Sequence, residues 1–242
     1  MSKVWIITKR ELSAFFDSLI AYVMIVLFLL LTGVFAWLIP QSNVFFGDQA
    51  SLQLFFGVSY WSLFFFIPAI TMRMIAEENK SGTIELLITK AVNDWEIVMG
   101  KFFACFILVL IALVLTLPFY FTVSQLGNVD DGGVIGGYLG LILLSGAYIG
   151  IGLFASSLSQ NQIVSILLAL LISVCFHMLF GQFGASLSGF VGRLFNYLSS
   201  TTHFASISRG VMDSRDIIYF VSLAAISLIG TKIMLSKRNW RD

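Results

Sequence analysis

The sequence has little charge. Asp, Glu, Lys and Arg make up only 11% of its 242 residues, whereas 58% are hydrophobic and the mean hydropathy is +0.95. Soluble domains carry roughly 25% charged residues, and a chain this apolar cannot cover itself with polar surface. The composition therefore predicts an integral membrane protein. Its Lys and Arg residues gather in no basic stripe or tail, so we expect no nucleic-acid partner.

Residues that usually carry chemistry are also scarce. The two cysteines, Cys105 and Cys175, each lie inside an apolar run, which indicates apolar packing and not a disulfide framework. Two histidines without a Cys or carboxylate cluster do not indicate a structural metal site. The chain has no G-x-x-x-x-G-K-S/T phosphate loop, so we expect it neither to bind nor to hydrolyse ATP.

Six apolar runs approach the ~20 residues that an α-helix needs to cross the ~30 Å hydrocarbon core of a bilayer. They cover residues 18–39, 52–72, 102–123, 134–158, 163–180 and 217–235. The first run is too long for the core of a cleavable signal peptide. The fifth is short, and Gly181, Gly184 and Gly189 after it predict irregular backbone, which membranes tolerate only where protein or water covers it. We therefore expect one all-α membrane domain over residues 1–242.

Residues 3–19, before the first run, have an amphipathic pattern. At about 100° per residue, one face carries Trp5 and Phe15 and the opposite face carries Lys9 and Arg10, with Ile6 and Ile7 as exceptions. A basic helix with aromatic residues on its apolar face is typical of the membrane interface. The alternative is an N-terminal extension of the first span.

The basic residues predict the orientation of the six spans. Eleven of the 14 Lys and Arg residues fall on the side that holds both termini, and the remaining three are Arg193, Arg209 and Arg215. Cytoplasmic loops carry the excess of basic residues, so we expect both termini and the insert 73–101 to be cytoplasmic. The segment 181–216 would then be external.

The fourth span is rich in glycine. Gly136 and Gly140, and likewise Gly146 and Gly150, form small-xxx-small pairs that allow another helix to approach closely. The pattern favours packing inside one subunit, and the alternative is a seam of a dimer or a pore.

Ionisable groups are nearly absent from the spans. An ion-coupled carrier retains such groups inside its helices, but these spans contain only His177 and the terminal Lys232. His177 is interpreted either as a hydrogen-bonded core residue or as a pore-lining group. The energy for any transport is therefore expected to come from outside the spans.

The polar insert between the second and third spans, residues 73–101, is the place where such energy could be delivered. Helix connections in bundles usually need 2–8 residues, so this insert is long for a simple turn. Residues 83–90 suit a short helix with Glu85 near its N-terminus and Lys90 near its C-terminus. Asn93 followed by Glu96 predicts a capping box that starts the next helix. We interpret the insert as a docking surface for a cytoplasmic partner, and the alternative is a plain loop.

A family resemblance becomes specific in this insert. The sequence there contains the pattern Arg73-x-x-x-Glu77-Glu78-x-Lys80-x-Gly82-Thr83-x-Glu85-Leu86-Leu87 and then Trp95-Glu96-Ile97-Val98-x-Gly100-Lys101-Phe102. This pattern resembles the signature of ABC-2 type transporter permeases, and the resemblance extends over essentially the whole chain. Ala91 departs from the family, in which many members have Pro after this segment. The stretch from His203 to Asp216 is similar to the external loop of gliding-motility-associated permeases and, less closely, to the permease of nitrous-oxide reductase maturation.

The resemblance implies a fold and a set of partners. It implies six transmembrane helices with an N-terminal interfacial helix, a cytoplasmic coupling helix and re-entrant external helices, as in type V exporters. It also implies a separate cytoplasmic ABC ATPase that uses the ATP and Mg²⁺, a second permease chain in a homo- or heterodimer, and a bacterial inner membrane. A periplasmic or accessory membrane protein would be a further partner. The segment that docks the ATPase would contain Glu77, Glu78, Ser81, Gly82, Thr83, Ile84, Glu85, Leu86, Leu87 and Lys90.

The external segment 181–216 is too apolar for a solvated loop and resembles the re-entrant helices that cap the path in this family. His177, Arg193, Arg209 and Arg215 are the candidates for an external gate or for contact with an anionic substrate or lipid headgroup. The pattern nevertheless favours the other interpretation, in which the arginines anchor the segment in the interface and pair with Asp213 and Asp216.

Two other functions remain open from the sequence. One is an anchoring membrane subunit that has no transport path. The other is an intramembrane serine protease, because Gly184-Ala185-Ser186 superficially resembles the serine segment of rhomboid proteases. A nucleophilic Ser needs a base within hydrogen-bond reach, and the last span supplies no His.

Overall fold

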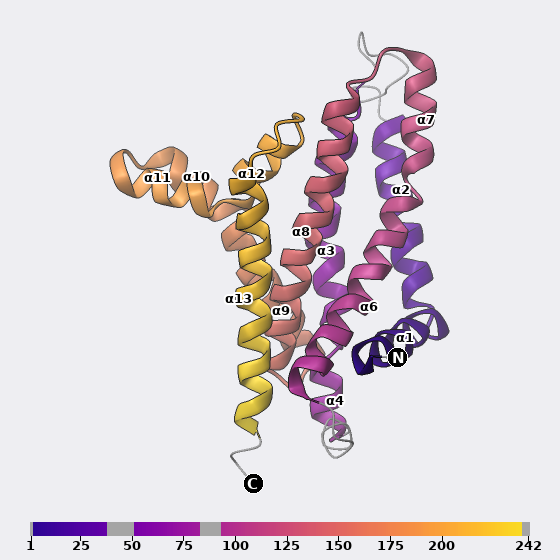
Figure 1. Cartoon of the computed structure of the whole chain (residues 1–242), viewed down its shortest axis with the longest axis vertical. Helices are drawn as coiled ribbons and strands as arrows, with labels where there is room; N and C mark the ends of the chain where they lie inside the picture. The colour runs from indigo at the N-terminus through magenta and orange to yellow at the C-terminus, as the bar shows by residue number, and fades with distance from the viewer. Residues whose placement is uncertain (1, 38–50, 83–92, 239–242) are drawn as a thin grey trace.

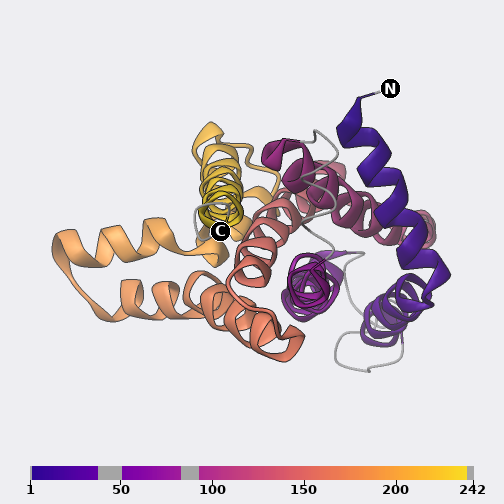
Figure 2. The same cartoon turned by 90° about the horizontal axis from the view of Figure 1, so that it is seen from below.

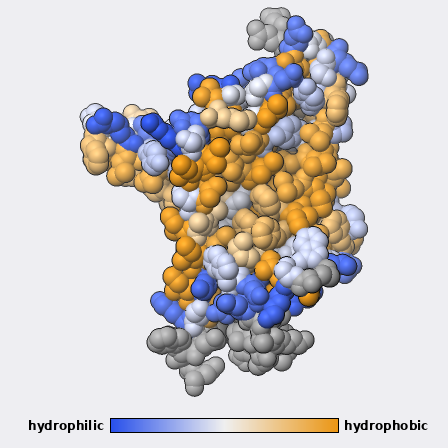
Figure 3. All heavy atoms as spheres, in the orientation of Figure 1, coloured by the Kyte–Doolittle hydropathy of each residue, from blue (hydrophilic) through white to orange (hydrophobic). Residues whose placement is uncertain are grey.

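The computed structural model describes residues 2–37, 51–82 and 93–238. All regular structure in these ranges is helical, and six helical stretches are long and apolar enough to cross a membrane. They stand side by side as a bundle (Figure 1), and on the face drawn in Figure 3 an apolar band covers its middle between two more polar ends. The expected all-α membrane fold with six candidate spans is therefore confirmed.

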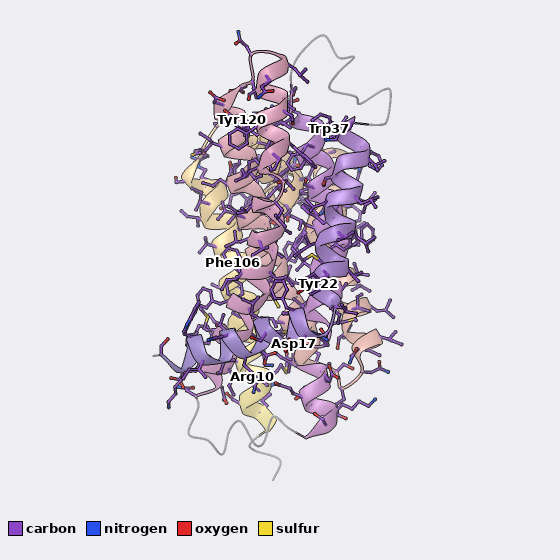
Figure 4. All side chains as sticks on the ribbon, turned by 90° about the vertical axis from the view of Figure 1, so that its right-hand side faces the viewer. Arg10, Asp17, Tyr22, Trp37, Phe106 and Tyr120 are labelled. Carbon is purple, nitrogen blue, oxygen red and sulfur yellow. The ribbon has the colours of Figure 1, made fainter. Side chains whose placement is uncertain are left out.

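The first helix lies across one end of the bundle. Helix α1 (Lys3–Asp17) starts at Ser2, whose side chain accepts a hydrogen bond from the Trp5 N–H. Helix α2 (Ile20–Trp37) then runs the length of the bundle at a steep angle to α1, as Figure 4 shows. The chain turns between them at Leu19, which has a φ of 60°, a left-handed conformation that is rare outside glycine. The start of α1 and the end of the C-terminal helix, α13 (Ser214–Arg238), lie at the same end of the bundle, which α1 crosses (Figure 1).

The second and third spans flank the insert. Helix α3 (Gln53–Thr71) continues after a short break into α4 (Ala76–Ser81), and α4 extends past the end of the bundle. Helix α6 (Asp94–Val114) begins at the predicted capping box of Asn93 and Glu96, in which both reciprocal hydrogen bonds are present. A break at residues 115–116 separates α6 from α7 (Leu117–Leu126), which begins next to Pro118.

Helix α8 (Asp131–Ser157) is the centre of the bundle. Within an apolar stretch of 18 residues of this helix, 78% are buried. Its glycines explain how the neighbouring helices come so close. A Cβ on Gly136 would clash with the Ile207 carbonyl, and one on Gly150 would lie 3.1 Å from the Ala224 carbonyl oxygen. The glycine pairs therefore pack inside the chain, as the sequence favoured.

The last part of the chain forms an arm and a final span. Helix α9 (Gln162–Val174) passes through a π-helical turn, η1 (Cys175–Leu179), into α10 (Phe180–Ser186). Helices α10 and α11 (Gly189–Leu198) pair in an arm that projects sideways from the bundle (Figures 1 and 2). The irregular backbone expected at Gly181 and Gly184 is not found, because both lie within α10; between residues 162 and 198 the chain departs from regular α-helix only at η1 and at residues 187–188. Two helices follow, α12 (Ser200–Ile207) and α13 (Ser214–Arg238).

Candidate functional site

Four charged side chains meet where α1, α4 and α6 come together, and two of them belong to the insert 73–101. The Lys101 side chain is only 1% exposed, and its Nζ lies 2.8 Å from Glu78 Oε1 and 3.2 Å from Glu11 Oε1. The Arg10 guanidinium pairs with both carboxylates, at 3.1 Å from Glu78 Oε1. We call Arg10, Glu11, Glu78 and Lys101 the charge cluster.

Close backbone packing makes this cluster possible. A Cβ on Gly100 would lie 2.6 Å from Ile7 Cγ2, so only glycine lets α1 approach α6 this closely. The Thr8 hydroxyl donates a hydrogen bond to the Gly100 carbonyl at 3.1 Å. On the predicted apolar face of α1, Phe15 is buried but Trp5 is 49% exposed, and Ile7, an exception to that face, is buried as well. Ile7 breaks the amphipathic pattern because it packs against α6.

The cluster is electrically balanced, with two positive and two negative groups. Burial by itself raises the pKa of the Glu11 carboxyl, but the Lys101 charge and the hydrogen bonds from Arg10 and Lys101 lower it more, so the pKa lies below its ordinary value. Burial likewise lowers the pKa of Arg10, and its two carboxylate partners raise it above its ordinary value. A buried ion pair is costly to break by removal of one partner, so this cluster fixes the position of α1 and α4 on α6.

Ser156, at the end of α8, holds the break between α3 and α4. Its Oγ accepts hydrogen bonds from the backbone N–H groups of Ile75 and Ala76 at 3.1 and 3.0 Å. The same hydroxyl donates to the Met72 carbonyl at 2.9 Å. One buried side chain thus caps the start of α4 and satisfies three backbone groups that the break leaves open.

The predicted docking residues fall into three groups. Glu77 and Ser81 are exposed on α4, and Gly82 ends that helix with a φ of 71°. Glu78 instead points into the charge cluster, where its side chain is 16% exposed. The remaining predicted docking residues lie outside the described residues: Thr83, Ile84, Glu85, Leu86, Leu87 and Lys90.

His177 is enclosed by aromatic rings in the π-helical turn. Its ring is stacked on Tyr60 at a centroid distance of 4.1 Å, and its Nδ1 lies 2.6 Å from the Tyr148 hydroxyl. The Thr201 hydroxyl donates to the His177 carbonyl at 2.5 Å and lies 3.0 Å from the Tyr60 hydroxyl. His177 is therefore buried and hydrogen-bonded, and it also borders the groove described next, so both features of its two interpretations are present. π-Helical turns inside α-helices occur frequently at functional sites.

Two hollows separate the other external candidates. His177 and Arg209 line a groove of about 870 Å³ between α3, η1, α10 and α12, which we call the external groove. Arg193 and Arg215 line a smaller hollow of about 370 Å³ with Asp213 and Asp216. None of these three arginines forms a salt bridge within the part of the chain that the structure describes.

The partner of Asp216 is a histidine and not an arginine. His203 Nδ1 lies 2.6 Å from Asp216 Oδ1, and His203 Nε2 lies 2.8 Å from the Tyr197 carbonyl oxygen. The His203 ring is also stacked on Tyr219 at 4.1 Å. This arrangement fastens α12 to the start of α13. The sequence expectation that Asp216 pairs with arginine is wrong, because burial places the carboxylate beside the imidazole.

The Ser186 side chain does not show the geometry of a nucleophile. Its hydroxyl donates to the Gln182 carbonyl at 2.8 Å, and no hydrogen bond among the described residues joins it to a histidine. Nor do the described ranges contain a group of three His, Cys, Asp or Glu residues that could hold a metal ion.

Comparison with known proteins identifies the family. The family model described as ABC-2 family transporter protein matches residues 38–233, a stretch that starts just after α2 and ends within α13. No curated protein matches the chain. A match over this much of the chain, together with six apolar helices, shows that the chain belongs to the ABC-2 transporter family as a multi-pass membrane permease subunit.

Proposed function

We propose that this chain couples ATP hydrolysis by a separate cytoplasmic ABC ATPase to export, or to force transmission, across a bacterial inner membrane. The observation that carries the proposal is the charge cluster at the base of the insert. It joins α4 and α6, the two helices that flank residues 83–92, to the transverse helix α1.

The connections of the insert suit the transmission of force. Helix α4 is fixed to α8 by Ser156 and to α6 by the pair of Glu78 and Lys101. A displacement of the insert would therefore move the ends of α3, α6 and α8 together and would not be absorbed by a loose loop. Interfaces and packed cores change between discrete arrangements, so such a shift can be passed to the far end of the bundle.

The docking surface in this proposal combines α4 with the segment that follows it. Glu77, Ser81 and Gly82 would contact the ATPase together with residues 83–90, whereas Glu78 would position α4 from inside. The working unit would contain two permease chains and two ATPase subunits, with the termini of this chain on the ATPase side. In the force-transmitting version of this function, the assembly would act on a periplasmic partner protein instead of moving a solute.

The decisive experiment purifies the tagged chain from its own host membranes in mild detergent and identifies the proteins that accompany it in stoichiometric amount. We expect a protein with a G-x-x-x-x-G-K-S/T loop, and its absence beside a folded chain would refute the ATPase coupling and favour an anchoring subunit. A second membrane chain in the same complex would indicate a heterodimer.

Variants then test the docking segment. We expect Glu85→Lys and Leu87→Asp to leave the chain in the membrane but to release the ATPase or lower its activity. The matched control is Leu126→Asp at the opposite end of the bundle, where the side chain is already half-exposed. If both insert variants keep the ATPase bound and active, the docking assignment is wrong.

A further inference from the structure

The external groove has walls of two kinds. Aromatic and apolar side chains, among them Phe56, Trp61 and Met178, line one part of it. Amide and hydroxyl side chains line another part, and Arg209 is its one charged lining residue among those that the structure describes. A surface with apolar walls, one cation and no carboxylate is complementary to an amphiphile with a negatively charged head.

The groove extends along α3 from the outer end of the bundle toward its middle. Gln53 and Trp61 both line it and are eight residues apart on one helix, which corresponds to about 12 Å along the helix axis. Gly210, next to Arg209, packs against Gly132 at the outer end of α8. Arg209 therefore lies near the outer end of the groove, and Trp61, which is 48% exposed, lines it farther along α3 toward the middle of the bundle.

The deep wall of the groove contains polar groups that have no partner among the described residues. Both His177 Nε2 and Ser199 Oγ are buried in residues that line the groove, and neither makes a hydrogen bond there. Unpaired buried polar atoms are costly, and they are frequent where a ligand or water completes the network. His177 is only 1% exposed, so it lies behind the surface of the groove.

We propose that the external groove binds a single amphiphile that carries an anionic headgroup, with the head at Arg209 and the apolar tail along Trp61 and Met178. This proposal rests on the transport version of the proposed function and names its class of cargo. The same chemistry is shared by a resident anionic phospholipid and by a free single-chain amphiphile, and the experiment below separates these two sources.

A larger residue at Gly57 would fill part of the groove. It lines the groove on α3, and a Cβ built on it meets no atom within 4 Å. A Cβ is therefore accommodated at this position, and we expect Gly57→Leu to extend a bulky side chain into the groove; leucine also suits a helix better than glycine does. Gly57→Ala is the matched variant that leaves most of the groove open.

The test uses the whole chain with Trp61 as its only tryptophan, the other four of its five being replaced by Phe. The protein is placed in phosphatidylcholine nanodiscs, and its fluorescence is followed during titration with 1-oleoyl lysophosphatidate or with mono-oleoylglycerol, which lacks the phosphate. We expect a saturable change with the lysophosphatidate and binding of the uncharged probe that is about tenfold weaker, the size expected for loss of one charge-assisted hydrogen bond.

Variants decide whether the signal comes from the groove. Arg209→Gln should remove the preference for the phosphate, whereas Arg215→Gln, an external arginine outside the groove, should keep it. Gly57→Leu should abolish the response to both probes, and Gly57→Ala should keep it. Equal responses to the two probes, or a response that Gly57→Leu leaves unchanged, would overturn the proposal.

Nanodiscs with phosphatidylglycerol separate the two sources. If these nanodiscs alone give the saturated signal and the lysophosphatidate adds nothing, the occupant is a resident lipid. If they give no change, the occupant is a free amphiphile. The binding test needs no ATPase, so failure of co-purification and failure of ligand binding are independent results.

Discussion

Replacement of Lys101 by Met tests the charge cluster most directly. The variant keeps the length and apolar stem of the side chain but removes the ammonium group that lies within 3.2 Å of both carboxylates. Glu11 and Glu78 would then face each other with only the half-exposed Arg10 as a partner, and Glu78 Oε2 is already buried without one. Removing one partner of a buried ion pair costs about 3–5 kcal/mol.

The loss should appear as local detachment of α1. We therefore expect the backbone amides of residues 3–17 to exchange with deuterium about a hundredfold faster or more in detergent, because each 1.4 kcal/mol corresponds to about a factor of ten. The matched control is Lys3→Met. The Lys3 side chain is 52% exposed, and its Nζ lies 3.8 Å from Glu96 Oε2, so this pair also joins α1 to α6. Such an exposed pair contributes at most about 1 kcal/mol.

The double variant Lys101→Met/Glu78→Gln provides the second check. It leaves Arg10 and Glu11 as one balanced pair, so it should restore part of the protection that Lys101→Met alone removes. If Lys101→Met raises the exchange of α1 no more than Lys3→Met does, the cluster does not hold α1 to the bundle. The reasoning would also fail if the double variant were less protected than the single one.

Three further predictions concern packing, the helix break and pH. Gly136→Ala should lower the free energy of unfolding in detergent by about 1–3 kcal/mol, because the new Cβ clashes with the Ile207 carbonyl. Gly146→Ala should be tolerated, since the nearest atom to its Cβ lies at 3.8 Å. Thermal unfolding followed by fluorescence compares the two variants. Ser156→Ala should lower the ATPase activity of the assembled complex, because it frees the start of α4; Ser157→Ala, which loses one hydrogen bond inside its own helix, should not. The pKa of Glu11 is lowered in the folded chain, so the Glu11 carboxylate should stabilise α1 fully above the ordinary carboxyl pKa of 4.5. This stabilisation should be lost as the pH falls below 4.5 toward the lowered pKa. Hydrogen exchange of α1 should therefore speed up in acid, and in Glu11→Gln it should lack this acid dependence.

The sequence was sufficient for the features that depend on local pattern. Apolar run length predicts the six candidate spans, and the spacing of Asn93 and Glu96 predicts the start of α6. The glycine pairs predict close packing because the residue itself limits how near a backbone can come. Each of these predictions needs only neighbours along one helix.

Features that join distant segments escaped prediction. Lys101 reads in the sequence as a flanking residue of a span, and Glu78 reads as one of several surface carboxylates, yet the fold buries them together with Glu11. The sequence contains one signal for the burial of Glu11. This residue is spaced four residues from both Ile7 and Phe15, so the three share one face of α1, and the structure buries Ile7 and Phe15. Nothing in the local pattern placed His203 beside Asp216, since that pair depends on how α12 returns to α13.

The buried centre of the bundle has a consequence for how the protein is made. Helix α8 carries the glycine surface, and α13, which covers part of that surface at Gly150, is synthesised after it. During insertion, α8 is therefore in the membrane before α13 can pack against it. Until then no large side chains cover the backbone of α8 along its glycine face. A chain truncated before α13 would expose the glycine face of α8 to lipid and to membrane proteases. We therefore expect mutations at the contact of α13 with α8 to reduce the amount of protein before they alter its activity.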